Sequence, residues 1–344
     1  MSGDITHETM HEQLVDIWEA AALSGVAAVQ APAGTVWLPT SEDGRDGRYL
    51  IYSVTKAFIA LTYLRYVDRN LLSLEDPVSD WLPIDLPREV TLRRLLNHTA
   101  GIPDYGRLPE YHQAVMAHPE TPWTDEEFLS RALAGGLDFE PGTRFNYSNT
   151  GYLLLRRLLD RMDGGGFAGA VREGVLEPLG LEATFLPEDP EGLRPLVPGE
   201  SRLVGPTVTD VRGVYHPHWV GHRVLASTIH DLLRFAPALT GAGLLSSDGL
   251  QQMLSGVDVG VDSHPFTRPR YGLGVMLDQR GRDHGVVGHL GGGPGYGAAL
   301  FRTYGPGDAP ITVAVLSNRD GGSEVQRVAL NLLDAAERHG HAAG

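Results

Sequence analysis

The sequence predicts an α/β (α+β) fold, in which an antiparallel sheet is flanked by N- and C-terminal helices and carries an inserted all-helical domain. Short β-branched and aromatic runs, broken by Gly, Pro and charged residues, occur near both ends of the chain. The middle of the chain carries helical periodicity instead. Strands at both ends with helices between them favour one sheet that is formed by both termini.

The N-terminal part is expected to form a helix, three strands and the start of a second helix. Residues 1–23 mix acidic residues and His with apolar residues, without a basic start or an unbroken apolar run. This pattern predicts an amphipathic helix rather than a signal peptide. An antiparallel meander is expected from residues 25–30, 34–39 and 48–52, and apolar residues at helical spacing predict a helix over residues 53–70.

The rest of the chain is expected to be helical first and then to return to strands. Helical patterns cover residues 90–96, 124–134, 150–162 and 228–239, and residues 187–217, rich in Pro and Gly, are expected to be loop. Strands are expected at residues 271–278, 286–289, 297–303 and 311–317, before a terminal helix at residues 323–339. We therefore expect an α/β domain from residues 1–70 plus 266–344 and an inserted domain from residues 71–265. The active site is expected at their junction.

Composition excludes several classes of function. The 344 residues are 42% hydrophobic and 21% charged, with a formal net charge of −15. This charge argues against nucleic acid and anionic membranes as partners, because both require clustered Lys and Arg. The absence of Cys excludes disulfides, a Cys nucleophile and thiolate metal sites. No stretch approaches the ~20 apolar residues that span a bilayer. We expect a cytoplasmic protein that acts on a small molecule, and the oligomeric state cannot be read from the sequence.

The basic residues are almost all Arg. Of the 28 Lys and Arg residues, Lys56 is the single Lys. Arg stays protonated, whereas a buried Lys can lose its proton and act as a base. Ser53 lies three residues earlier, so on a helix the hydroxyl and the amine share one face. This spacing favours a serine nucleophile with a lysine base. The alternative is an ordinary N-cap serine beside a solvated lysine.

Two further segments carry groups suited to this chemistry. Tyr147 and Asn149 follow a turn-forming Glu-Pro-Gly and precede a predicted helix, where a phenol can relay a proton and an amide can orient a lysine. A tyrosine there can also simply be packing. His289, Gly291 and Gly292 end a predicted strand, and a backbone N–H among such glycines can stabilise an oxyanion, although a plain turn is the alternative. A loose dinucleotide pattern follows, but it precedes a strand rather than a helix, so we reject it.

Together these segments resemble the serine β-lactamase and penicillin-recognising superfamily. Its three motifs are matched in order by Ser53-x-x-Lys56, Tyr147-x-Asn149 and His289-x-Gly291. The resemblance is to the class C-like branch, which includes family-eight esterases, D-aminopeptidases and related acyltransferases. Context supports it in the segments at residues 95–102, 139–142 and 271–274, so nearly the whole chain is covered.

The resemblance implies roles for these residues. Ser53 would be acylated, Lys56 would take its proton, and Tyr147 would be a base or relay that Lys56 keeps ionised. Asn149 would position Lys56 and the substrate, and the N–H groups of Ser53 and Gly292 would form the oxyanion hole. His289, Gly291 and Gly292 are expected to bind the substrate.

The third motif departs from the family pattern. The β-lactamases and carboxypeptidases of the superfamily usually have Lys-Thr-Gly there, whereas this chain has His289 and then a Leu, which has no hydroxyl. This departure favours a serine hydrolase that acts through an acyl-enzyme on a small ester or amide, either an esterase or amidase or an acyltransferase. A β-lactamase or a D-Ala-D-Ala-type peptidase is the alternative.

Two other classes of function stay open. His216 and His218, with His222 and Asp210 nearby, could suggest a metal site, although histidines in such a loop are more often solvated or packed. A non-catalytic protein that binds a ligand is the other class. We expect neither a metal nor a cofactor.

Overall fold

The computed structural model describes residues 2–39, 44–162, 165–241, 243–260, 266–280, 284–306 and 309–342. Its centre is an eight-stranded sheet in the order β2-β1-β12-β11-β10-β9-β8-β7, and the paired strands are antiparallel. The strands are β1 Gly25–Ala31, β2 Gly34–Leu38, β7 Val257–Asp258, β8 Pro269–Tyr271, β9 Met276–Gln279, β10 Gly285–Gly293, β11 Tyr296–Tyr304 and β12 Thr312–Ser317.

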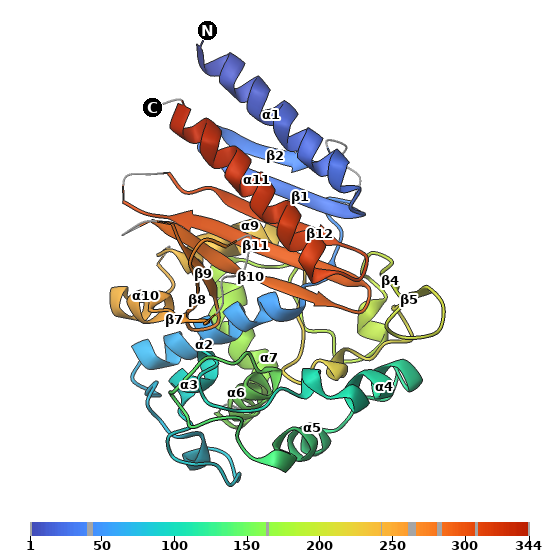
Figure 1. Ribbon diagram of the computed structural model, residues 1–344, viewed down its shortest axis with the longest axis vertical. Helices are drawn as coiled ribbons and strands as arrows, with labels where there is room; N and C mark the ends of the chain where they lie inside the picture. The colour runs from blue at the N-terminus through green and yellow to red at the C-terminus, as the bar shows by residue number, and fades with distance from the viewer. Residues whose placement is uncertain are drawn as a thin grey trace.

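Two terminal helices cover one face of the sheet. Helices α1, Ser2–Ala21, and α11, Gly322–Ala342, run side by side across it, and both chain ends lie at the same end of the molecule (Figure 1). Side chains from both helices meet the sheet in one apolar core, for example Trp18, Leu333 and Phe301. Burying this face accounts for the amphipathic patterns at the two ends of the sequence.

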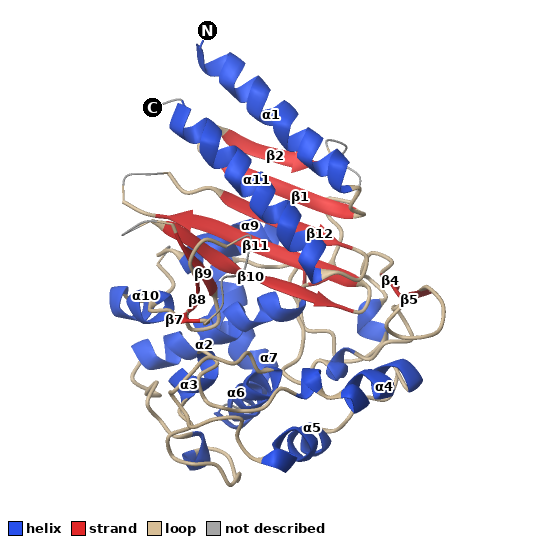
Figure 2. Ribbon diagram, viewed as in Figure 1, coloured by secondary structure: helices blue, strands red, loops and turns tan. Residues whose placement is uncertain are grey.

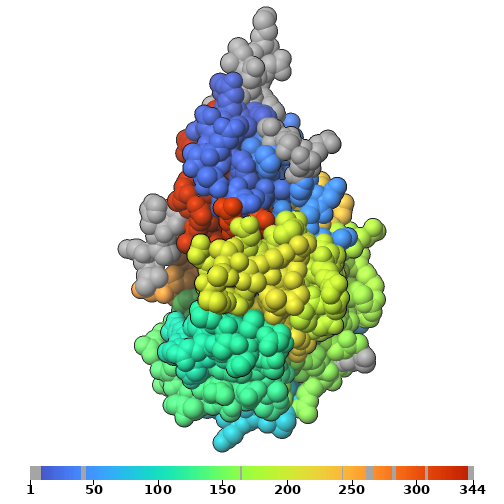
Figure 3. Space-filling model, turned by 90° about the vertical axis from the view of Figure 1, so that its right-hand side faces the viewer, coloured from blue at the N-terminus to red at the C-terminus, as the bar shows by residue number. Residues whose placement is uncertain are grey.

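The remaining helices lie on the other side of the sheet, where a few contact its opposite face and most of the others pack on those helices (Figure 2). They are α2 Thr55–Asp68, α3 Leu92–Leu96, α4 Pro109–Ala117, α5 Asp125–Ala132, α6 Asn149–Met162, α7 Gly166–Val171, α8 Glu177–Leu179, α9 Ile229–Phe235 and α10 Ser247–Leu254. Helix α2 is apolar on nearly all sides and is buried among the others, which makes it the centre of this second core. In Figure 3 the teal segment that carries α4 lies directly below the yellow segment that carries β4, Glu200–Ser201, and β5, Thr209–Asp210.

The fold class predicted from the sequence is confirmed, with local differences. Residues 48–52 do not extend the N-terminal meander: β3, Tyr49–Leu50, pairs instead with β6, Ala226–Ser227. The reason is that the chain turns directly after Leu50 to enter α2 on the far side of the sheet. The strand expected at residues 271–278 divides into β8 and β9, which pair with each other.

The inserted region also contains short strands, since β4 to β7 all lie between residues 71 and 265. The division into domains at residues 70/71 and 265/266 stays a prediction. Its second boundary adjoins residues 261–265, which lie outside the described residues.

Candidate active site

Ser53 lies in a tight turn between β3 and α2. The turn is one 3₁₀ helix, Tyr52–Val54, and α2 follows it at once. Tyr52 has a φ of 41°, a left-handed conformation that is costly for a residue other than Gly. Its hydroxyl donates to the Pro294 carbonyl at 2.5 Å, which pins the turn to the hairpin of β10 and β11. The sequence predicted a helix from Ser53, and the structure begins that helix with this strained turn.

Lys56 is fully buried in the first turn of α2. Its Nζ lies 2.9 Å from Ser53 Oγ, 2.8 Å from Asn149 Oδ1 and 3.2 Å from His222 Nε2. Burial lowers the pKa of Lys56 well below its usual value, and the Asp104 carboxylate opposes this shift. The lowered pKa favours a neutral amine, which can accept a proton.

Asn149 is held by the segment that precedes α4. Asp104 Oδ1 accepts from the Asn149 backbone N–H at 3.0 Å, and Asp104 Oδ2 accepts from Asn149 Nδ2 at 3.3 Å. With its amide nitrogen bonded to Asp104, the Asn149 side chain turns its oxygen toward Lys56. Asp104 therefore fixes the orientation of a residue that holds the amine.

Tyr147 lies over Lys56 and against Ser53. The Lys56 amine is 4.9 Å from the centre of the Tyr147 ring. Burial raises the pKa of Tyr147 above its usual value, although a hydrogen bond with Ser53 acts in the opposite direction. The His98 ring packs on Tyr147 with centroids 4.2 Å apart, and His98 Nδ1 accepts from the Ser148 backbone N–H at 3.1 Å. His98 thus supports the segment that carries Tyr147.

The third predicted segment forms the last part of β10. This strand pairs with β11 as far as Gly293 but with β9 only as far as Gly288, so within the described part of the chain its final residues have no strand partner on the β9 side. The Ser53 turn lies against this free edge. A Cβ on Gly291 would lie 2.1 Å from the Ile51 carbonyl oxygen, so only glycine lets the turn approach so closely.

His289 faces the protein interior rather than the pocket. Its Nδ1 donates to the Leu290 carbonyl at 2.5 Å, which leaves Nε2 to accept from the Tyr271 hydroxyl at 2.8 Å. Burial is the main cause that lowers the pKa of His289 to about 3, so the ring is neutral at physiological pH. Direct substrate contact by His289 and Gly291 stays a prediction, while Gly292 is among the residues that line the pocket.

A pocket of about 350 Å³ opens beside Ser53. Its lining includes Asn149 and His222, and its outer part is formed by Met116 of α4 and by Leu203, whose side chains are about half exposed. These two residues come from the neighbouring teal and yellow segments of Figure 3. The pocket therefore brings a nucleophile, a buried amine and an apolar entrance together.

The histidines that suggested a metal site have other partners in the structure. His222 lies beside Lys56, while His218 Nε2 pairs with Glu188 at 3.0 Å and its backbone N–H donates to His216 Nδ1. Across the described ranges, no three His, Asp or Glu side chains are grouped to hold a metal ion.

Sequence reasoning missed part of the site. Asp104 and Tyr52 carry no motif of their own, although Asp104 follows closely on the segment at residues 95–102. His222 was noticed only as a possible metal ligand. Its contact with Lys56 joins residues 166 positions apart, and no local spacing can reveal such a contact.

Comparison with known sequences identifies the family. The sequence model of the family described as Beta-lactamase matches residues 12–337. The chain belongs to the beta-lactamase family. The resemblance drawn from the three motifs is therefore confirmed, and so is the fold that it implied.

Individual relatives of this family member include hydrolases. Esterase EstB of Burkholderia gladioli is 29% identical over 308 residues, which are 80% of this chain and 74% of EstB. A D-stereospecific amidohydrolase from Streptomyces sp. has a structure with a TM-score of 0.80 and 29% identity, and the match covers 93% of this chain and 98% of that one. The family and these relatives indicate a serine hydrolase.

A third relative is longer than the match. A penicillin-binding protein of Bacillus subtilis (strain 168) is 27% identical over 298 residues. These residues are 83% of this chain but only 63% of that protein, less than two thirds of its length. None of the described helices of this beta-lactamase family member is long and apolar enough to cross a lipid bilayer.

Proposed function

We propose that this protein hydrolyses an ester or amide of a small molecule through an acyl-enzyme on Ser53. The observation that carries the proposal is the contact between Ser53 Oγ and the buried Lys56 amine, 2.9 Å apart at the edge of a pocket. Family membership and the esterase and amidohydrolase relatives support the same reaction class. Hydrolysis and acyl transfer share this intermediate and differ in whether water or another nucleophile resolves it.

In the proposed first step, neutral Lys56 accepts the Ser53 proton while Oγ bonds to the substrate carbonyl carbon. A neutral amine has two N–H groups and one lone pair. If the N–H groups donate to Asn149 Oδ1 and His222 Nε2, at 2.8 and 3.2 Å, the lone pair is left for Ser53. His222 can accept because burial lowers the pKa of its ring and favours the neutral form. We therefore assign His222 to the site as a positioning residue.

The proton must then reach the leaving group as its bond to carbon breaks. Tyr147 contacts Ser53 and lies over Lys56, so its hydroxyl can pass the proton from the amine to the leaving oxygen or nitrogen. The raised pKa of Tyr147 and the lowered pKa of Lys56 favour two neutral groups. We accordingly propose a neutral phenol relay instead of the tyrosinate that the resemblance implied. Water then attacks the acyl-enzyme by the reverse route.

Backbone N–H groups are proposed to stabilise the oxyanion. Gly293 and Tyr296 close a two-residue hairpin, and successive residues of an antiparallel strand direct their N–H groups to opposite sides. On this alternation the Gly292 N–H points away from β11, toward the side where the Ser53 turn lies. The Ser53 N–H approaches the same place, since it lies 3.0 Å from a Cβ built on Gly291. Two donors at one point suit an oxyanion hole.

The test is labelling followed by turnover. Intact mass is recorded for wild type and Ser53→Ala after exposure to a fluorophosphonate, and hydrolysis of p-nitrophenyl acetate is then followed. We expect one adduct on wild type, none on the variant, and more than one equivalent of product from wild type alone. An unlabelled wild type without turnover would favour a ligand-binding protein instead.

The β-lactamase alternative needs its own comparison. We expect simple esters to be cleaved faster than a chromogenic cephalosporin, because neutral His289 supplies no cation for a substrate carboxylate. Much faster opening of the cephalosporin would reverse this preference. A cytoplasmic location is also proposed, and cell fractionation tests it.

A further inference from the structure

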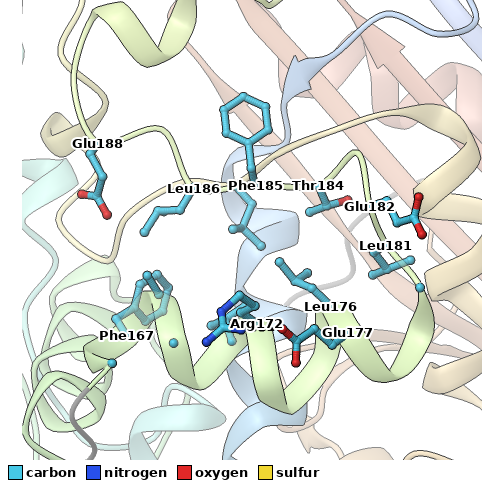
Figure 4. Close-up of a pocket in the computed structure, with 16 residues that line it drawn as sticks. Phe167, Arg172, Leu176, Glu177, Leu181, Glu182, Thr184, Phe185, Leu186 and Glu188 are labelled. Atoms are coloured by element: carbon cyan, nitrogen blue, oxygen red, sulfur yellow. Dashed lines mark hydrogen bonds and ion pairs between the residues drawn. The ribbon is translucent and has the colours of Figure 1, made fainter.

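A second hollow of the molecule lies beside α7 and α8, apart from the Ser53 pocket. It encloses about 730 Å³, a volume within the range of pockets that hold small molecules. Among the described residues, none lines both hollows. Apolar side chains form most of the surface of this groove, among them Phe167, Leu176, Leu181 and Leu186 (Figure 4). The groove can therefore bury the apolar part of a ligand that never reaches Ser53.

The helical wall of the groove has open space beside it. Helix α7 continues into a π-helical turn, Arg172–Leu176, and then into α8. Such π-helical turns are rare and frequently mark functional sites. In α7, Gly169 is buried and lines the groove, yet a Cβ built on it would meet no described atom within 4 Å outside the backbone of its own helix. A glycine at this position thus leaves room for a ligand.

The charged side chains of the groove are mainly acidic. Its described lining has one Arg and three Glu, which gives a formal charge of −2. The Arg, Arg172, donates to Glu177 and Glu173, so its charge is already paired. Glu182 and Glu188 lie toward opposite ends of the groove (Figure 4). The groove therefore favours a positively charged ligand.

A histidine contacts Glu188 without neutralising it. His218 Nε2 lies 3.0 Å from Glu188 Oε2. Burial is the main cause that lowers the pKa of His218 to about 4, and the charge of Arg223 acts in the same direction, so the ring is neutral at physiological pH. The Glu188 carboxylate therefore keeps its negative charge beside the groove.

The groove is suited to binding rather than to catalysis. Thr184 supplies a hydroxyl, but its Oγ1 is bonded to Ser227 Oγ and Asp231 Oδ2, each at 2.8 Å. No other Ser, Thr, His or Lys lines the groove among the described residues. A molecule held there would therefore meet no nucleophile that is free to attack it.

We propose that this groove binds a small organic cation with an apolar body, and that Glu182 and Glu188 attract its ammonium group. Burial of the apolar body supplies most of the binding free energy, and the carboxylates select for positive charge. The groove is thus a second ligand site, separate from the acyl-enzyme reaction proposed for Ser53.

The experiment compares three ligands of one shape and different charge by isothermal titration calorimetry. They are para-phenylbenzylamine, which is a cation, para-phenylbenzyl alcohol, which is neutral, and para-phenylbenzoate, which is an anion. At low salt we expect wild type to bind the amine about fivefold more tightly than the alcohol, the upper scale of an exposed ion pair, and to bind the benzoate most weakly. Added salt should narrow these differences, because it screens exposed charges.

Two variants of Gly169 locate the binding. Gly169→Leu places a side chain in the open space and should weaken binding of both the amine and the alcohol by at least about tenfold, because the site is then overfilled. Gly169→Ala adds one methyl group to a helix and should bind both ligands within about twofold of wild type. Thermal unfolding of each variant checks that it is folded.

The carboxylates are tested as a pair. The double variant Glu182→Gln/Glu188→Gln should bind the alcohol as wild type does and lose the preference for the amine. Its matched control, Glu110→Gln/Glu191→Gln, removes the same formal charge at exposed positions outside the groove lining and should keep the preference. If Gly169→Leu does not fold, these two double variants decide the matter.

Three outcomes would overturn the inference. One is equal binding of the amine and the alcohol by wild type. Another is an amine preference that survives in Glu182→Gln/Glu188→Gln, or binding unchanged in a folded Gly169→Leu, because the ligand would then lie elsewhere. The third is a dimer in analytical ultracentrifugation that Gly169→Leu abolishes, because a second copy of the chain would then occupy the groove.

Discussion

Two hollows of the molecule differ in size and in chemistry. A groove beside α7 and α8 encloses about 730 Å³, about twice the volume of the pocket at Ser53, which is about 350 Å³. Figure 4 shows its apolar side chains, among them Phe167, Leu176 and Phe185, with charged groups among them. Arg172 pairs there with Glu177 and Glu173, which lie on the same helical segment. The groove therefore combines apolar surface with an Arg172 that is already paired.

The smaller pocket is chemically different. Its edge holds a fully buried Lys whose pKa is lowered, a Tyr whose pKa is raised and a serine hydroxyl, all in mutual contact. Groups with perturbed pKa values cluster at catalytic sites, because burial and close partners prepare them to exchange protons. Variants in the two hollows should accordingly affect different properties.

The largest effect is expected at Lys56. Lys56→Met removes the proposed base, and Lys56→Arg keeps a cation that cannot lose its proton. Both should lower kcat for p-nitrophenyl acetate by at least about a thousandfold, the scale seen when one member of a catalytic unit is removed. Stopped-flow measurement of p-nitrophenol release checks this. A Lys56→Arg enzyme within tenfold of wild type would mean that the amine acts as a charge and not as a base.

Tyr147→Phe should have the next largest effect. Loss of the proton relay is expected to lower kcat about a hundredfold. The dependence of kcat/KM on pH should keep its shape. Activity should rise with pH as Lys56 loses its proton, with a midpoint below the usual lysine pKa because the folded-state pKa is lowered. The same rise should appear in Tyr147→Phe at a lower plateau. If the rise disappeared with the phenol, an ionised Tyr147 would be the base after all.

Replacement of His222 should lower kcat about tenfold. His222→Leu removes an acceptor from the Lys56 amine, so the lone pair is no longer directed at Ser53. The resulting loss in kcat should correspond to the free energy of about one hydrogen bond. Because a lost acceptor also destabilises the ammonium form, the acid limb of the pH profile should move to lower pH. His222→Gln retains an acceptor and should restore most of the rate. If kcat fell equally in the Leu and Gln variants and the acid limb did not move, His222 would serve only as a packing residue.

The sequence predicted the parts of the site that are local in the chain. Ser53 and Lys56 are one helical turn apart, so their spacing relates them directly. Tyr147 and Asn149 are two residues apart, and the resemblance to the superfamily joined them to that pair. The fold was equally accessible, because both ends show strand patterns. Asp104 and His222 escaped prediction because their roles depend on contacts across 45 and 166 residues. His289 carried a motif, yet its ring turns to Tyr271, and a motif does not specify which way a side chain points.

The smallest effect on activity is expected in the large groove. Phe185 is half-buried in its wall, so Phe185→Ala should lower the free energy of unfolding by about 1–2 kcal/mol, less than the loss for a fully buried Phe. Its kcat should stay within about twofold of wild type, because Phe185 contacts none of the reacting groups. Urea unfolding and ester turnover on one preparation measure both quantities. A large loss of kcat at unchanged stability would show that the groove communicates with Ser53. The route would be Leu225, which lines the groove and whose carbonyl accepts from the Ile51 N–H at 2.9 Å.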